Sequence, residues 1–262
     1  MNTNEKNELE LFFLGTCACD FSPRLKTDLK DKFDKDARRS SSVLINGSVL
    51  IDCGYHTVQS LGIAGIPLSD ITDIFVTHLH EDHYLPQNVQ KIADAKDEPL
   101  RLWVREGAEV AEFCNVDVRF MTQFEKYESS GLSFTAIPAN HSPQHHPQHF
   151  IVESGDKRVF YGCDGAWFLH DSFKFLENKH LTLAVFDCTV GDYAGDFRMG
   201  EHNSIPMIRL MLPSLSTVKA IDENTKIMIS HLAPSLHKPH AETEKIIADF
   251  GTVAYDGMTV KV

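Results

Sequence analysis

Residues 74–83 read Ile-Phe-Val-Thr-His-Leu-His-Glu-Asp-His, an apolar strand-like run followed directly by four potential metal ligands. The four side chains are His78, His80, Asp82 and His83. A helix would spread them around its circumference, whereas a tight loop after a strand can turn them to one side. Imidazole nitrogen and carboxylate oxygen suit Zn, Mn or Fe. The stretch therefore predicts a metal site at a strand end, against the alternative of a polar loop whose histidines cap a helix.

Three more residues of ligand type stand just beyond other strand-like runs. They are His141 after residues 134–138, Asp164 after 159–161 and His231 after 227–230. In open α/β sheets, sites collect beyond the carboxyl ends of the strands. One such histidine would more often be an ordinary loop or core residue. Ligand-type residues at four separate strand ends point to a single site.

Outward from these residues, the pattern of apolar runs predicts the layers of the fold. We expect strands at residues 9–14, 43–51, 74–77, 100–104, 132–137, 149–152, 159–161, 183–186, 226–229 and 258–262. We expect helices at 57–61, 85–95, 107–114, 171–178, 205–212 and 240–250. Strands come first and then alternate with helices, which indicates two sheets with helices outside, a four-layer αββα sandwich. Residues 1–262 are expected to form one domain of this kind.

Composition narrows the classes of partner. The chain has 262 residues, is 42% hydrophobic and carries a formal net charge of −12 with a pI near 5.6. Nonspecific binding to nucleic acid or an anionic membrane is disfavoured, although bound cations could create a local positive site. Six cysteines form no dense disulfide pattern, and no signal-like or membrane-spanning apolar run is present. We expect a cytoplasmic protein with reduced thiols; a secreted one is the alternative.

Two polar segments are expected to be loops. Residues 23–42 alternate charges of both signs, as a solvated surface loop does. The alternative for this segment is functional, with Arg38 or Arg39 reaching a substrate phosphate. Residues 189–201 contain three glycines, and loops of this length are either functional or disordered.

The H-x-H-x-D-H run resembles the signature of the metallo-β-lactamase superfamily, and Asp52 in Asp-Cys-Gly resembles the Asp-x-Gly that precedes it. The resemblance extends over nearly the whole chain and implies an αββα sandwich holding two divalent metal ions, Zn or Mn, with Fe as a further candidate. It implies that His78, His80 and His141 bind one metal. It implies that Asp82, His83 and His231 bind the other, and that Asp164 bridges them. An Asp bridge, rather than the Cys of the main β-lactamase subclass, is typical of the phosphodiesterase, tRNA-processing and glyoxalase branches.

Three further segments resemble the cyclic phosphodiesterase family of phosphonate degradation. They are residues 14–19, residues 186–188 with the later 201–203, and residues 255–258. This resemblance implies a hydrolase of small cyclic phosphodiesters that uses metal-activated water, with His202 beside the substrate phosphate and with His202 and Asp82 as the catalytic residues. The structural zinc common in that family is doubtful, because Cys17 and Cys19 have no third Cys nearby and no His directly follows residues 232–234. The alternative for both thiols is burial as small apolar residues.

Other functions remain as alternatives. A tRNA 3′-end endonuclease shares the ligands and a residue like His202, but its long basic arm is not seen and the net charge is wrong for tRNA. A thioester hydrolase of the glyoxalase type would need a separate substrate-binding helical domain after His231. A noncatalytic metal-binding or nucleotide-binding member would normally have lost ligands. We therefore expect a small-molecule phosphodiester as partner, no membrane, no nucleic acid, and a homodimer as the commonest assembly.

Further histidines and aromatic residues lie near the predicted ligands. His145, His146 and His149 are expected to line the mouth of the pocket, because the seven ligands already fill two sites. Trp167 and Phe168 could pack beside a sugar or base, and core packing is an equal alternative.

Overall fold

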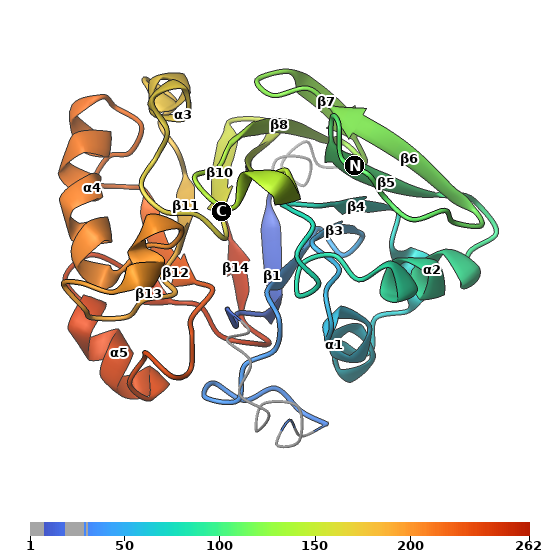
Figure 1. Ribbon diagram of the computed structural model, residues 1–262, viewed down its shortest axis with the longest axis horizontal. Helices are drawn as coiled ribbons and strands as arrows, with labels where there is room; N and C mark the ends of the chain where they lie inside the picture. The colour runs from blue at the N-terminus through green and yellow to red at the C-terminus, as the bar shows by residue number, and fades with distance from the viewer. Residues whose placement is uncertain (1–7, 19–28, 30) are drawn as a thin grey trace.

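The computed structural model describes residues 8–18, 29 and 31–262, which form two seven-stranded sheets (Figure 1). The first has the order β14 (Thr259–Lys261), β1 (Glu10–Gly15), β2 (Ser42–Ile45), β3 (Val49–Ile51), β4 (Asp73–Phe75), β5 (Leu100–Arg105), β6 (Val116–Met121). The second has the order β13 (Thr252–Val253), β12 (Lys226–Ser230), β11 (Leu183–Asp187), β10 (Lys157–Gly162), β9 (Gln148–Ser154), β8 (Leu132–Pro138), β7 (Lys126–Ser129). Strands β3 to β6 run parallel, as do β10 to β13.

Helices cover the outer face of each sheet. They are α1 (Thr57–Ala64) and α2 (Pro86–Asp94) on the first sheet, and α3 (His170–Leu176), α4 (Ile205–Thr217) and α5 (His240–Ile247) on the second (Figure 1). The described residues also include the short 3₁₀ turns η2 (Leu68–Asp70), η3 (Pro143–His145) and η4 (Phe197–Gly200). The predicted four-layer αββα sandwich is confirmed.

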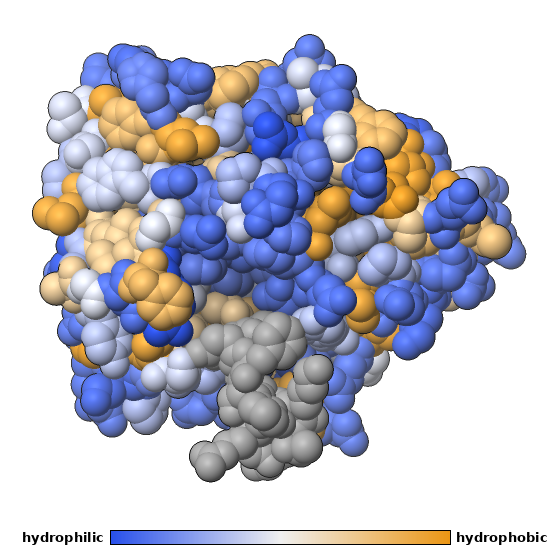
Figure 2. Space-filling model, viewed as in Figure 1, coloured by the Kyte–Doolittle hydropathy of each residue, from blue (hydrophilic) through white to orange (hydrophobic). Residues whose placement is uncertain are grey.

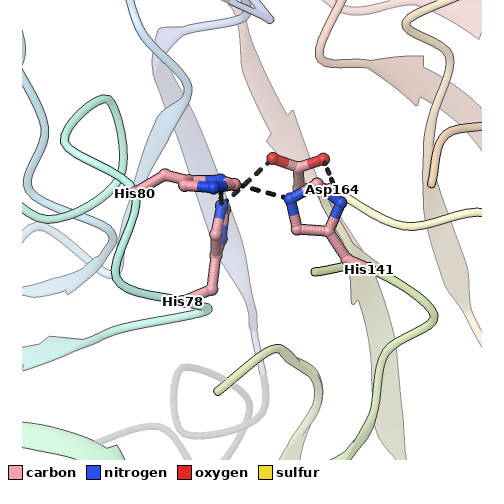
Figure 3. Close-up of side chains that lie close together, drawn as sticks. All are labelled: His78, His80, His141 and Asp164. Atoms are coloured by element: carbon pink, nitrogen blue, oxygen red, sulfur yellow. Dashed lines mark hydrogen bonds and ion pairs between the residues drawn. The ribbon is translucent and has the colours of Figure 1, made fainter. Parts of the chain in front are cut away.

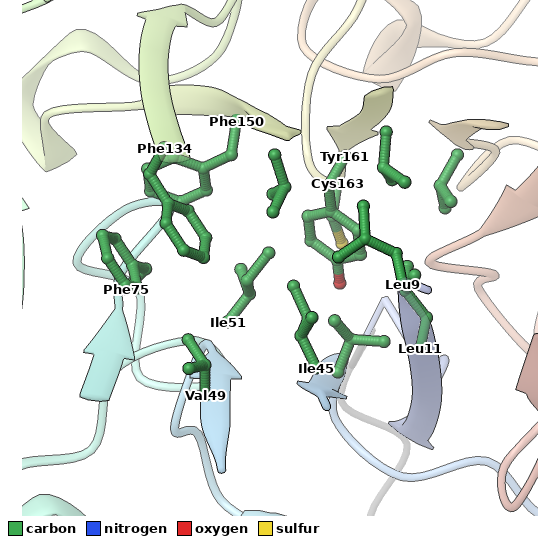
Figure 4. Packing of buried hydrophobic residues seen from close by; sticks show 14 of the residues in the cluster. Leu9, Leu11, Ile45, Val49, Ile51, Phe75, Phe134, Phe150, Tyr161 and Cys163 are labelled. Carbon is green, nitrogen blue, oxygen red and sulfur yellow. The ribbon is translucent and has the colours of Figure 1, made fainter. Parts of the chain in front are cut away.

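The hydrophobic core has three layers, one between the sheets and one under each set of helices. The central layer joins side chains from both sheets (Figure 4). Phe75 of the first sheet stacks on Phe134 of the second, with ring centroids 3.7 Å apart, and also on Trp103 of its own sheet, at 5.2 Å. Large buried aromatic surfaces of this kind supply much of the stabilisation that holds two sheets together.

Several predicted elements differ from the structure. The run 43–51 is a hairpin, because Asn46 and Gly47 both have positive φ (47° and 74°) and turn the chain between β2 and β3. The helix predicted at 107–114 is wrong: this segment is an irregular connection that begins at Gly107 (φ 85°). Its apolar residues Val110 and Phe113 pack on the core without helical geometry. Strands β6 and β7 escaped prediction because only the last residue of each is buried, two charged residues interrupt the apolar ones of β6, and β7 is mostly polar.

The predicted surface loop 23–42 lies partly outside the described residues, and its described end is buried. Arg38 is only 5% exposed, and its guanidinium donates to Thr16 Oγ1 (2.6 Å) and to the carbonyl of Ala254 (2.7 Å). Arg39 has no exposed surface and donates its backbone N–H to Asp256 (2.7 Å). Neither arginine lines the cavity described below, so the alternative that one of them reaches a substrate phosphate is not supported.

The face shown in Figure 2 is hydrophilic across its middle, with apolar patches to either side. Within residues 8–18, 29 and 31–262, no helix has the length and apolar character needed to cross a membrane.

Candidate metal centre

The first cluster of ligand-type side chains joins His78, His80, His141 and Asp164 (Figure 3). His78 and His80 come from the loop after β4, and His141 comes from the loop after β8. His80 Nδ1 lies 2.8 Å from His78 Nε2 and 3.2 Å from His141 Nε2. Three ring nitrogens from two segments about sixty residues apart therefore converge on one point.

The second cluster is centred on His83 Nε2. This nitrogen lies 3.1 Å from His231 Nε2 and 3.5 Å from Asp82 Oδ2. His83 has no exposed surface and His231 is 1% exposed, while Asp82 lies at the wall of a cavity. The two sheets thus contribute one histidine each, His83 from the loop after β4 and His231 from the end of β12.

Asp164 lies between the two clusters. Its Oδ2 is 3.2 Å from His78 Nε2 in the first cluster. The same oxygen is 3.5 Å from both His83 Nε2 and His231 Nε2 in the second cluster. A single carboxylate therefore reaches the nitrogen ligands of both sites.

The donor set and its spacing fit metal binding. Nitrogen and oxygen ligands held tetrahedrally at 2.0–2.2 Å from Zn lie roughly 3.3–3.6 Å apart. The contacts within the two clusters span 2.8–3.5 Å, close to this range. Both carboxylate oxygens of Asp164 face ring nitrogens, since Oδ1 lies 2.9 Å from His202 Nδ1 and Oδ2 lies 3.2 Å from His78 Nε2. The donor types and their spacing therefore fit divalent metal binding.

Three of the residues that build the centre have left-handed backbone conformations. Asp52, Asp164 and His231 have φ values of 66°, 64° and 56°, and each stands just beyond the carboxyl end of a strand. A non-glycine residue in this region costs on the order of 1–3 kcal/mol. The left-handed residue follows the strand end, and the side chain of each of the three lies against a histidine of the two clusters.

Asp52 and Thr77 orient the ring of His83 in the second cluster. Asp52 has no exposed surface, and its Oδ2 lies 2.7 Å from His83 Nδ1. The backbone N–H and hydroxyl of Thr77 both donate to Asp52, at 2.7 and 2.9 Å. A carboxylate on Nδ1 fixes the tautomer that leaves Nε2 free to bind a metal.

His202 lies beside the shared carboxylate. Its Nδ1 is 2.9 Å from Asp164 Oδ1 and 3.0 Å from Asp187 Oδ2. The ring also lines the cavity, so the opposite nitrogen, Nε2, is the one available to a bound molecule. Asp187 is fully buried at the end of β11 and also lies 3.2 Å from His231 Nδ1.

The environment sets the ionisation of these groups in the metal-free chain. Burial lowers the pKa of His78 well below its usual value and that of His80 to about 4, so both are neutral at pH 7 and ready to bind a metal. Burial alone would raise the pKa of Asp82, but the neighbouring His83 and His231 lower it to about 2.

Two histidines shift the other way. Burial opposes charge on His83, but Asp82 and Asp52 outweigh it and raise the pKa well above its usual value. For His202, burial is likewise outweighed by Asp164 and Asp187, which raise the pKa to about 11. Metal binding at His83 must therefore displace a proton.

A cavity of about 370 Å³ opens over both clusters. It is lined by Ala18, Tyr55, His80, Glu81, Asp82, His141, Asp164, Glu201, His202 and His231. Tyr55 donates its hydroxyl to Glu81, and Ser142 donates to Glu201 at 3.3 Å. The described part of the lining contains no Lys or Arg, so its fixed charges are acidic apart from protonated histidine.

The structure also places the other histidines, cysteines and aromatic residues that the sequence analysis singled out. His149 is buried, with Nε2 3.4 Å from the carbonyl oxygen of Asp164, so its predicted place at the pocket mouth is wrong. His145 packs against His80, with ring centroids 4.0 Å apart and the rings tilted by 45°. Cys17 is buried, and Cys19 lies outside the described residues. Trp167 is 40% exposed, whereas Phe168 packs on the core.

Sequence reasoning assigned no role to Asp187 or Thr189. Both follow the rule that identified Asp164 and His231, since they stand at the end of a parallel strand. Their position at a strand end could have identified them, but neither residue belongs to a dense run of potential metal ligands.

Comparison with known proteins gives partial matches in sequence and full-length matches in structure. The family model of the anti-Pycsar protein Apyc1 matches residues 33–86, which include the H-x-H-x-D-H run. Ribonuclease Z of Methanothermobacter thermautotrophicus is 30% identical over 118 residues, 39% of this chain and 38% of that protein. Ribonuclease Z of Methanosarcina mazei is 31% identical over 111 residues, 37% of this chain and 33% of that protein. The matched region thus spans little more than a third of these relatives.

Solved structures align over almost the whole chain. A diphosphatase of the PhnP family has a TM-score of 0.72 at 18% identity, covering 97% of both chains. YhfI of Bacillus subtilis, a metallo-β-lactamase fold protein, has a TM-score of 0.72 at 12% identity, covering 98% of this chain and 100% of the other. Human tRNase Z, short form, has a TM-score of 0.63 at 19% identity, covering 96% and 98%. The chain therefore has the metallo-β-lactamase fold, and its predicted resemblance to that superfamily is confirmed at this level.

Proposed function

We propose that this protein is a metal-dependent phosphodiesterase that holds two divalent cations and acts on a small, cyclic phosphodiester. The observation that carries the proposal is the position of His202, which lies 2.9 Å from the shared carboxylate of Asp164 and also lines the cavity. Cations at the two sites would offset the negative charge of a bound phosphate. The protonated ring of His202 beside them could donate its proton to an oxygen of the same phosphate group.

Each residue has a defined task in this proposal. His78, His80 and His141 would hold one cation, Asp82, His83 and His231 would hold the other, and Asp164 would serve both. When bound, two such cations lower the pKa of water and offset negative charge on the phosphate. His202 donates a hydrogen bond to a phosphate oxygen, or it protonates the departing oxygen as water's oxygen bonds to phosphorus and the P–O ester bond breaks. Asp187 holds the ring of His202 in place.

The size and charge of the cavity favour a small substrate. About 370 Å³ is at the lower end of the range for small-molecule sites. Glu81 and Glu201 on its wall would repel a polyanion, and the chain has a net charge of −12. Both carboxylates can instead accept hydrogen bonds from hydroxyl or amino groups of a sugar or base. The ribonuclease Z relatives support the second candidate, cleavage of tRNA precursors.

The experiment uses His202→Ala, with His170→Ala on the exposed start of α3 as the matched control. The protein is loaded with Zn, Mn or Fe in turn and assayed on bis(p-nitrophenyl) phosphate, cyclic phosphodiesters and a tRNA precursor. His202→Ala should keep its metal content and lose about 10²–10⁴-fold in kcat on cyclic phosphodiesters. The loss should shrink with the p-nitrophenolate leaving group if His202 protonates that group, and should persist if it holds the phosphate.

Three results would contradict the proposal. Unchanged kcat in His202→Ala on every substrate would remove His202 from the reaction. A tRNA precursor cleaved faster than all small diesters would favour the second candidate. Fewer than two metals per chain, with no hydrolysis of any substrate, would point to a noncatalytic binding protein.

A further inference from the structure

The hydroxyl of Thr189 is a meeting point inside the metal centre. Thr189 follows β11 and is only 3% exposed. Four polar atoms surround its Oγ1: His231 Nδ1 at 2.9 Å, His202 Nδ1 at 3.1 Å, Asp187 Oδ2 at 3.1 Å and the carbonyl oxygen of His231 at 3.1 Å. Among the described side chains, only Thr189 and Asp187 lie within hydrogen-bond distance of both His202 Nδ1 and His231 Nδ1.

The protons at this point can be counted. A hydroxyl can accept two hydrogen bonds and donate one. If His231 binds a metal through Nε2, its Nδ1 must carry the proton and donate it. His202 Nδ1, which faces carboxylates, is likewise a donor. Two donors and two acceptors then surround one hydroxyl, so Thr189 accepts from both rings and donates to Asp187 or to the carbonyl of His231.

We propose that Thr189 is a positioning residue that ties the orientation of the metal ligand His231 to that of His202. Without the hydroxyl, His231 Nδ1 has only Asp187 Oδ2, at 3.2 Å, and must share it with His202 Nδ1, at 3.0 Å. His202 Nδ1 can then turn toward Asp164 Oδ1, at 2.9 Å, so the orientations of the two rings are no longer linked. The part that concerns His202 in catalysis rests on the proposed function, whereas the part that concerns His231 does not. Thr189 itself belongs neither to the clusters of ligand-type residues nor to the lining of the cavity, so it acts through the side chains that its hydroxyl contacts.

The test compares Thr189→Val, which keeps the shape and removes the hydroxyl, with Thr189→Ser, which keeps the hydroxyl. Zn affinity is measured by competition with a chelator, and folding is followed by thermal unfolding. Thr189→Val should weaken Zn binding by about 10–100-fold, the usual effect of losing a hydrogen-bond partner of a metal-bound histidine. Thr189→Ser should restore Zn binding to within a few-fold. Equal Zn affinity in Val, Ser and the unmodified protein would overturn the proposal.

A double-mutant cycle tests the link to His202. On bis(p-nitrophenyl) phosphate at saturating Zn, Thr189→Val should lower kcat by about tenfold, roughly the worth of one hydrogen bond. In the His202→Ala background the same change should leave kcat unaltered, while its effect on Zn affinity remains. Additive losses in kcat would refute the connection.

A spectroscopic readout separates this proposal from the proposed function. In ¹⁵N-histidine-labelled, Zn-loaded protein, Thr189→Val should shift the Nδ1 resonances of both His202 and His231, and Thr189→Ser should return both. Movement of only one ring would overturn the proposal even in an active enzyme. Movement of both rings in a protein that cleaves no phosphodiester would sustain it while the proposed function fails. If Thr189→Val does not fold, Thr189→Ala replaces it in each measurement.

Discussion

The segment that follows β3 lies against the loop that carries the metal ligands, and Gly54 is the point of closest approach. A Cβ placed on Gly54 would be 1.6 Å from the carbonyl oxygen of Asp82 and 2.9 Å from the backbone nitrogen of His83. The backbone N–H of Cys53 donates to the carbonyl of His83 (2.7 Å), and that of Leu85 donates to the carbonyl of Cys53 (2.9 Å). These bonds hold the two segments together, so neither can retreat without breaking them.

We predict that Gly54→Ala disrupts the metal centre. The Asp82 carbonyl must withdraw by at least 1.4 Å to reach 3.0 Å, below which real Cβ contacts essentially do not occur. Asp82 and His83 would move with it, and a displacement of about 1 Å in a catalytic site can cost on the order of 10²-fold in rate. Overpacking of this kind costs roughly 1–3 kcal/mol of stability. We therefore expect at least tenfold weaker Zn binding and a lower unfolding temperature.

Gly62→Ala is the matched control, because Gly62 lies within α1 and a Cβ there meets no atom within 4 Å. This substitution should leave Zn binding unchanged and stabilise the helix by about 0.5–1 kcal/mol. Zn affinity is measured by chelator competition and stability by urea unfolding. Normal Zn affinity and stability in Gly54→Ala would show that the loop has room to move, and the argument from close approach would be refuted.

Two further predictions concern buried carboxylates. Asp164→Ala should lower metal content, measured by elemental analysis, and should cost more activity than alanine at any one ligand that serves a single site; two retained metals with normal turnover would exclude Asp164 from the centre. Burial raises the pKa of Asp256 to about 7 despite the nearby Arg38. Because the folded chain then binds this proton more tightly than the unfolded chain, the free energy of unfolding should fall by roughly 4 kcal/mol between about pH 4 and pH 7. Asp256→Asn should flatten that pH dependence in urea titrations; an unaltered slope would contradict the assignment.

The parts of the fold that sequence predicts are those with strong apolar contrast. Strands β8 and β11 are buried along nearly their whole length and stand out as apolar runs. β6 and β7 lack this contrast, because only the last residue of each is buried and charged residues interrupt both, so their strand structure depends on pairing with their neighbours. At residues 107–114 the apolar residues suggest a helix that the structure does not contain. Those residues pack on the core from an irregular segment rather than from a helical face.

The residues of the metal centre also differ in how readily the sequence predicts them. A run of ligand types at a strand end is visible in sequence because its residues are adjacent, and isolated ligand types at other strand ends follow the same rule. The orienting residues are harder to predict, because their role depends on distances between distant segments. Asp52 stands out in the sequence through its resemblance to the Asp-x-Gly motif, and it contacts His83, whereas Asp187 and Thr189 acquire their role only when β11 and β12 lie side by side.

Backbone strain explains why this centre depends on the whole fold. Asp tolerates a left-handed conformation better than most residues, but His231 is less suited to it, and all three strained positions border the two clusters. In the metal-free chain, the strain is offset by hydrogen bonds that leave Asp52, Asp187 and Thr189 each engaged with a ligand histidine. Removing one of these contacts therefore lets the strained residue at the strand end relax and also lets the histidine ring change its orientation. Losses at the orienting residues should for this reason lower stability and metal affinity together, whereas alanine at His202, which has an ordinary backbone, should lower the rate alone.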